Sequence, residues 1–168
     1  EFEEATEGEE VDRKEKLKSR WAQLEAVVGA EGRLKLVARD LMDHFEARLG
    51  TMNGKAMVVV MSRRIAVELY KELVDLRPQW HSTDDEQGAL KIVMTGSASD
   101  RALLRPHIYS AQVKKRLEKR FKAPDDALRL VDVGAPRERI FRAACPINDA
   151  DLLDVRVTGC IRVFEVVA

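Results

Sequence analysis

The sequence predicts an α/β fold in which a parallel sheet is flanked by helices. Residues 57–61 form an unbroken apolar run rich in valine, which is typical of a central strand. Ile65, Leu69 and Leu73 then follow at intervals of four, as expected of a half-buried helix. A second short apolar run occupies residues 90–94. An apolar strand followed closely by an amphipathic helix is one unit of a parallel sheet covered by helices.

Two amphipathic helices are expected before the first strand. The first begins near residue 14 and reaches residue 28, and Gly29 with Gly32 end its pattern. The second covers residues 33–49 and ends at Gly50. Because the connection is short, the sequence predicts an antiparallel helical hairpin. The apolar positions of the two helices recur every three or four residues: Leu17, Trp21, Leu24, Val27, Val28, Leu34, Val37, Leu41, Phe45 and Leu49.

The elements after the first strand alternate in type. A helix is expected over residues 65–77, and a polar surface loop over residues 82–88 separates it from the strand at 90–94. A strongly basic helix follows over residues 112–122, and a further strand is expected over residues 127–133. This alternation supports the α/β class.

Length and charge limit the classes of protein that are compatible with the chain. Its 168 residues suit one domain with a core. The 29 acidic and 29 basic residues balance, but residues 1–15 carry eight acidic and two basic side chains, whereas residues 101–122 carry eight basic and one acidic. We expect the acidic start to be disordered, and its lack of Met suggests a fragment of something longer. No stretch has the length of a membrane span or the pattern of a signal peptide, so a cytoplasmic protein with reduced thiols at Cys145 and Cys160 is expected.

No motif for catalysis, nucleotide binding or metal binding is present. The chain lacks Gly-x-x-x-x-Gly-Lys-Ser/Thr, Gly-x-Gly-x-x-Gly and Gly-x-Ser-x-Gly, and Gly54-Lys55 lies before its strand instead of after it. His44, His81 and His107 lack metal-ligand spacing and are expected to be surface or capping residues. We therefore predict no catalytic residue and no metal ligand.

Small and basic side chains follow the predicted strands. Residues 95–99 read Thr-Gly-Ser-Ala-Ser, and they suit either a phosphate contact or a simple turn and helix cap. Arg63 and Arg64 follow the first strand, at the edge where open α/β sheets place their binding crevices. The arginines and the basic helix suit either nucleic-acid phosphates or a solvated surface.

Three segments of the chain carry a family resemblance: Glu-Phe-Glu-Glu-Ala-Thr-Glu-Gly at the start, residues 55–73, and Ile-Val-Met-Thr-Gly-Ser-Ala at residues 92–98. Through these segments, residues 1–131 resemble the motor portion of the restriction (R) subunit of type I restriction-modification enzymes. The segment Lys-Ala-Met-Val-Val-Val-Met-Ser-Arg-Arg is similar to helicase motif IV of that family. The matched region is similar to the second RecA-like domain of a superfamily-two helicase motor and the helices leading into it, which divides the chain into residues 1–54 and 55–168.

The resemblance implies a large bacterial enzyme that hydrolyses ATP with Mg²⁺, translocates double-stranded DNA and cleaves it, in complex with methylation and specificity subunits. In such motors the ATP lies between two RecA-like domains, and the P-loop and metal site belong to the first domain, which this chain lacks. This segment alone is therefore expected to be inactive and to need no cofactor of its own. The residues expected to contact the DNA backbone are Ser62, Arg63, Thr95, Gly96 and Ser97.

The chain departs from the family after Val131. Neither motif V, with its Thr-Gly-Phe-Asp character, nor the arginine finger of motif VI appears in residues 132–168. Arg137, Arg139 and Arg142 therefore cannot be matched to the finger. A divergent end, a truncation and a change of reading frame all suit this composition, and residues 155–167 have the character of a strand that pairs with the sheet.

Two other classes of function are compatible with the residues. In the first, the chain is a stand-alone interaction module without enzymatic activity, and the helices of Trp21 and Phe45 bind a partner protein. In the second, it is a flavodoxin-like or receiver-like enzyme, but a receiver needs acidic residues where this first strand ends in Met61-Ser62. The DNA sequence recognised and the oligomeric state are not encoded in any motif of this chain.

Overall fold

The computed structural model describes residues 11–51, 54–96, 100–134, 152–158 and 161–167. For the last two of these ranges it describes the backbone only. The expectations for the acidic start at residues 1–10, for Ser97 and for the two cysteines lie outside the described residues. None of the described helices is long and apolar enough to cross a membrane.

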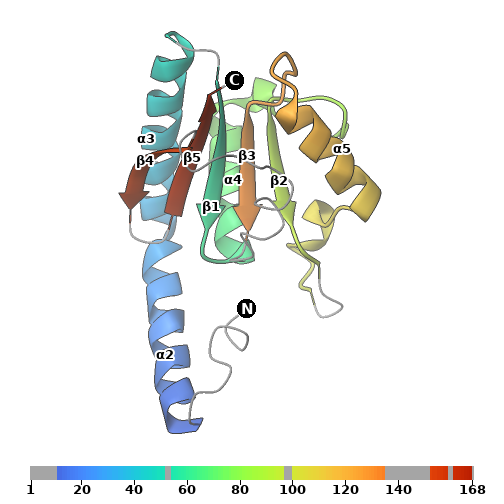
Figure 1. Cartoon of the computed structure of the whole chain (residues 1–168). Coiled ribbons are helices and arrows are strands. Elements are labelled where there is room, and N and C mark those ends of the chain that lie inside the picture. Colours follow the sequence, from blue (N-terminus) through green and yellow to red (C-terminus); the bar gives the residue numbers. More distant parts are fainter. Residues whose placement is uncertain (1–10, 52–53, 97–99, 135–151, 159–160, 168) are drawn as a thin grey trace.

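A five-stranded mixed sheet forms the centre of the molecule (Figure 1). Its strand order is β2-β3-β1-β5-β4. Strand β3 lies between β1 and β2 and runs parallel to both, whereas β5 pairs antiparallel with β1 and β4 pairs antiparallel with β5. The strands are β1 (Gly54–Val60), β2 (Leu90–Met94), β3 (Leu130–Gly134), β4 (Leu152–Thr158) and β5 (Ile161–Val167).

The predicted α/β class is confirmed, but the sheet is not wholly parallel. The expectation of a parallel sheet holds for β1, β2 and β3. It is wrong for the carboxyl-terminal strands. The strand character expected over residues 155–167 and its pairing with the sheet are confirmed, since these residues lie in β4 and β5 and β5 pairs with β1. Only two residues separate β4 from β5, and so short a connection can join antiparallel strands but not parallel ones, which need a longer crossover.

The helices follow the predicted order, with ends shifted by a few residues, and two short 3₁₀ segments were not predicted. Most of these shifts are of one or two residues, as expected where helix ends fray, and the largest is at α2, which begins at Val11 instead of near residue 14. The elements are α2 (Val11–Val28), α3 (Glu31–Leu49), α4 (Arg63–Leu76), η1 (Pro78–Trp80), η2 (Arg105–His107) and α5 (Ala111–Lys122).

The predicted antiparallel hairpin of the first two helices is wrong. Helices α2 and α3 follow each other end to end, and α2 projects beyond the sheet (Figure 1). The side chains that a hairpin would bury remain exposed, since Leu24 is 43% and Val27 is 59% accessible. Trp21 instead packs against the main core. The short connection does not produce a hairpin, because the apolar side chains of α3 pack against α4 and the sheet instead of against α2.

Two hydrophobic clusters cover the opposite faces of the sheet. Alternate residues of a strand point to opposite faces, so Ala56, Val58 and Val60 of β1 pack with α3 and α4 in the larger cluster. Met57 points the other way and packs with Leu117 of α5 in the smaller cluster. The sheet is thus held between α3 and α4 on one side and α5 on the other, which leaves its strand ends as the places where polar groups gather.

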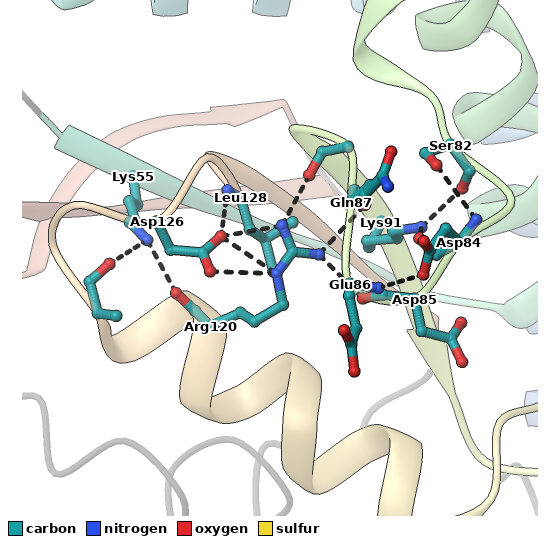
Figure 2. Close-up of polar contacts among 12 residues, drawn as sticks. Lys55, Ser82, Asp84, Asp85, Glu86, Gln87, Lys91, Arg120, Asp126 and Leu128 are labelled. Carbon is teal, nitrogen blue, oxygen red and sulfur yellow. Dashed lines mark hydrogen bonds and ion pairs between the residues drawn. The ribbon is translucent and has the colours of Figure 1, made fainter.

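Two buried lysines, Lys55 and Lys91, hydrogen-bond to backbone carbonyls near the amino ends of the parallel strands (Figure 2). The Lys55 ammonium donates to the Arg120 and Ala123 carbonyls at 3.0 and 2.5 Å, and so caps the end of α5. The Lys91 ammonium donates to the Ser82 carbonyl at 2.6 Å. Burial lowers the pKa of both lysines. Lys55 thus has a structural role, and this edge of the sheet is closed by its own side chains.

Candidate functional site

The carboxyl ends of the three parallel strands meet at one edge of the sheet. Gly134, the last residue of β3, is in register with Val60 of β1 and with Met94 of β2. The segments that follow β1 and β2 therefore leave the sheet side by side, and the Arg63 Nη1 donates to the Thr95 carbonyl at 2.9 Å.

Four of the five residues predicted to contact DNA lie at this edge. Ser62 and Arg63 follow β1, and Thr95 and Gly96 follow β2. Ser97 lies outside the described residues. The structure thus brings these residues together, while their contact with DNA stays a prediction.

Ser62 is the N-cap of α4. Its backbone is extended, and its hydroxyl accepts a hydrogen bond from the Ile65 N–H at 3.3 Å, which is the usual role of serine at a helix start. The same hydroxyl donates to Glu25 Oε1 at 2.8 Å. Only 7% of the surface of Ser62 is accessible. In this structure its role is to cap α4 and to bind Glu25.

Arg63 is held in place by an ion pair at the same edge. Its Nη1 lies 2.7 Å from Asp100 Oδ1, and the two side chains are 21% and 4% accessible. A Cβ added to Gly134 would lie only 3.1 Å from the Arg63 Cα and 2.9 Å from the Ala66 Cβ. The close approach of α4 to the end of β3 therefore requires a glycine at this position, and it places the arginine directly over the strand ends.

The segment after β2 is fixed from two sides. The Thr95 carbonyl accepts from Arg63, and a Cβ added to Gly96 would come within 2.5 Å of the Ile108 Cγ2. Gly96 is exposed and Thr95 is half-buried. Thr95 and Gly96 are thus held against Arg63 and Ile108, while Gly96 faces solvent.

Helix α2 is attached to the start of α4 through Glu25. The Glu25 Oε1 accepts from Arg64 Nε at 3.3 Å as well as from Ser62. Arg64 also reaches both carboxylate oxygens of Glu68 through Nη1, at 3.0 and 2.9 Å. The sequence pattern did not reveal Glu25 or Asp100, because each lies more than 30 positions from its partner and neither stands in a recognisable motif.

The basic helix α5 divides into structural and solvent-facing cations. Arg120 points inward to Asp126, while Arg116 approaches the acidic loop at Asp85 to within 3.8 Å. Lys115 and Lys119 are exposed and make no ion pair within the described part of the chain. The solvated interpretation therefore fits part of this helix, and Arg120 belongs to the fold.

Two of the histidines pack against Tyr70. The Tyr70 hydroxyl lies 2.9 Å from His81 Nδ1, and the His107 ring makes an edge contact with the Tyr70 ring at 5.6 Å. Burial, together with the charge of Lys71, lowers the pKa of His107. Over the described ranges, no group of three or more histidine, cysteine or acidic side chains has the arrangement of a metal site.

Asp132 is a buried carboxyl group in the middle of β3. It is fully inaccessible, and neither carboxylate oxygen has a hydrogen-bond partner among the described residues. By strand alternation it points to the same face as Leu130, toward α4. Burial raises its pKa well above the usual value. An acidic residue thus occupies a core position at the point where the resemblance to the motor family ends.

Two curated proteins are similar to much of this chain. The type I restriction enzyme HindI endonuclease subunit of Haemophilus influenzae is 49% identical over 109 residues, which cover 65% of this chain and 10% of that protein. The putative type I restriction enzyme MjaIXP endonuclease subunit of Methanocaldococcus jannaschii is 36% identical over 136 residues, which cover 79% of this chain and 12% of that protein. No family model and no solved structure matches significantly. The chain spans about a tenth of the length of these curated relatives, and over most of its own length it is similar to a segment of type I restriction enzyme endonuclease subunits.

Proposed function

We propose that this chain is part of the DNA-translocating motor of a type I restriction endonuclease R subunit, in the position of its second RecA-like domain. The observation that carries the proposal is the 49% identity to a HindI endonuclease subunit across 65% of the chain. The parallel arrangement of β1, β2 and β3, with helices on both faces, is compatible with such a domain. In this assignment the chain supplies DNA-backbone contacts and half of the interdomain ATP cleft.

The carboxyl edge is the part of the chain best suited to a phosphate. Open α/β sheets bind ligands outside the carboxyl ends of their strands. Arg63 brings a guanidinium group to this edge, Gly96 brings an exposed backbone, and α4 begins here. The amino end of a helix favours negative charge. These features support contact with the DNA backbone, which does not depend on base sequence.

The parent enzyme would supply the remaining parts of the motor. ATP and Mg²⁺ would bind at a P-loop and metal site elsewhere in the R subunit, and the methylation and specificity subunits would complete the complex on double-stranded DNA. The purified chain with ATP, Mg²⁺ and duplex DNA is therefore expected to show only background phosphate release in a coupled assay. DNA-stimulated turnover would contradict this division of roles.

Replacing Arg63 with glutamine is expected to weaken DNA binding. When one phosphate contact is lost, about one counterion fewer is released on binding. The plot of log affinity against log salt concentration is therefore expected to become less steep, by about 0.9 in slope. Fluorescence anisotropy with a labelled duplex, between about 50 and 200 mM salt, measures both quantities.

Arg77→Gln is the matched control for Arg63→Gln. Arg77 also pairs with a carboxylate, Glu46 at 2.5 Å, but it follows the last residue of α4 whereas Arg63 is the first. Its replacement removes the same charge and is expected to leave the slope unchanged. If Arg63→Gln and the unaltered chain show the same slope of log affinity against log salt, Arg63 does not contact a DNA phosphate and the proposed role of this residue is wrong.

An interaction module without enzymatic activity is the second candidate. Of the two helices expected to bind a partner, α3 turns Phe45 into the core, where it is 3% accessible and packs edge-on against Trp80 at 6.0 Å, and α2 packs the partly buried Trp21 against the same core. The exposed Leu24, Val27 and Leu36 still favour a protein contact along α2 and α3. DNA affinity that does not depend on salt, or is absent at low salt, would favour this candidate.

A further inference from the structure

We propose that the carboxylates of Asp100 and Glu25 bind the polar side chains at the carboxyl ends of the parallel strands in the free chain. A DNA phosphate group displaces these two carboxylates when the duplex binds. This inference rests on the proposed function, because it concerns how the same edge becomes available to duplex DNA. It assigns the two carboxylates an inhibitory role, and it links DNA binding to the attachment of α2.

Asp100 is the more direct competitor. Its carboxylate lies 2.7 Å from the Arg63 guanidinium, and only 4% of its side chain is accessible. A guanidinium group binds carboxylate and phosphate with the same planar pattern of donors. A phosphate that approaches Arg63 therefore meets a group of like charge already at that position, and it gains the arginine only as Asp100 is displaced.

Glu25 binds the side chains of Ser62 and Arg64, which are next to Arg63 in the sequence. One carboxylate oxygen accepts from the Ser62 hydroxyl at 2.8 Å and from Arg64 at 3.3 Å. The Arg64 Nη2 also donates to the Glu25 backbone carbonyl at 3.3 Å. Because Glu25 lies in the last turns of α2, a phosphate that takes over Ser62 or Arg64 would loosen the end of α2 from the start of α4.

Arg63 and Ser62 each have a second interaction that is independent of the two carboxylates. Arg63 keeps its hydrogen bond to the Thr95 carbonyl at 2.9 Å, and Ser62 keeps the one from the Ile65 N–H. Neither interaction involves Asp100 or Glu25. An amide in place of either carboxylate retains the acceptor oxygen and the size of the side chain while it removes the charge.

Asp100→Asn and Glu25→Gln test the proposal in the whole 168-residue chain. We expect each variant to bind a fluorescein-labelled DNA duplex more tightly at low salt, by about fivefold or more, which is the lower end of typical coupling between linked sites. The matched control is Glu46→Gln, which removes one charge from a comparable pair with Arg77 and is expected to change affinity by less than about twofold.

The outcomes separate this inference from the proposed function. If Arg63→Gln weakens binding but Asp100→Asn leaves it equal or weaker, Asp100 only positions the arginine and the inhibitory role is overturned. If Arg63→Gln has no effect, the DNA contact itself fails. Unlabelled inorganic phosphate or ATP with Mg²⁺, added at constant ionic strength, is expected not to release the duplex, and release by either would overturn the assignment to DNA.

Hydrogen exchange gives a second readout that needs no substitution. If a phosphate displaces Glu25, amides in the last turn of α2 should exchange faster in the presence of the duplex, while those in the middle of α4 should not. Slower or unchanged exchange in α2 would overturn the link between DNA binding and the attachment of this helix. Circular dichroism at the assay temperature verifies that the variants remain folded.

Discussion

Replacing Asp132 with valine is expected to stabilise the protein. Asp132 is fully buried in β3, and neither of its carboxylate oxygens has a partner among the described residues. Even a neutral polar group buried without a hydrogen bond costs about 1–3 kcal/mol in proteins. Since valine suits a strand whose neighbours in the sheet are Val58 and Ile92, we expect the free energy of unfolding to rise by at least that amount at pH 7. Urea denaturation followed by circular dichroism measures it.

The gain from Asp132→Val is expected to depend on pH. Burial raises the pKa of Asp132 in the folded state above its usual value of 3.8. Between 3.8 and the folded value, the folded chain binds a proton that the unfolded chain has lost, so its stability falls as pH rises. The valine variant lacks this loss. The difference in free energy of unfolding between the valine variant and the unaltered chain is therefore smallest near pH 4 and grows toward neutral pH.

Asp132→Asn separates the charge from the missing hydrogen bonds. Asparagine removes the ionisable group but leaves a polar amide in the same place. It is expected to remove the pH-dependent part of the cost and to retain the part measured near pH 4. If the valine variant proves less stable than the unaltered chain at pH 7, Asp132 makes an interaction that outweighs its burial, and this explanation is wrong.

Replacing Arg120 with methionine is expected to destabilise the protein by about 3 kcal/mol, as when one partner of a buried ion pair is removed. The guanidinium is bound by Asp126 at 2.9 Å and by the carbonyls of Asp85, Gln87 and Gly88 at 2.9–3.1 Å (Figure 2). Its side chain is only 11% accessible. Methionine preserves the apolar stem but leaves the carboxylate and three carbonyls without this donor, and thermal or urea unfolding measures the loss.

The contribution of Arg120 is expected to decline in acid. Burial alone would raise the pKa of Asp126, but hydrogen bonds from Arg120 and the Leu128 N–H lower it below its usual value. A carboxyl whose folded pKa is lowered contributes stability above the unfolded value, and that stability is lost as pH falls through the folded value. The difference in free energy of unfolding between the Arg120→Met variant and the unaltered chain should therefore become smaller below about pH 4.

Lys119→Met is the matched control for Arg120→Met. Lys119 is the preceding residue of α5, is exposed and has no ion pair in the described part of the chain. It is expected to change stability by less than about 0.5 kcal/mol. Equal effects at the two positions would mean that the inward network of Arg120 adds nothing beyond the charge of the helix.

The α/β class and the order of its elements followed from local patterns. The apolar run of β1 and the four-residue spacing of Ile65, Leu69 and Leu73 report directly which residues must leave water. The same reasoning placed Ser62, Arg63 and Thr95 at strand ends, since parallel strands end at one edge. It could not show that the sheet gains antiparallel strands, because pairing of β5 with β1 depends on which edge is open.

The helices, the parallel strands and the residues at their carboxyl ends could be predicted from the amino-acid pattern alone, because burial leaves a periodic signal along the chain. Three features became visible only when the elements were packed together. Helices α2 and α3 do not form a hairpin (Figure 1), Arg120 points inward, and Asp100 and Glu25 bind side chains of the candidate site. These are contacts between residues remote in sequence. A hydrogen bond or ion pair across such a distance depends on how elements pack, and neither spacing nor composition records it.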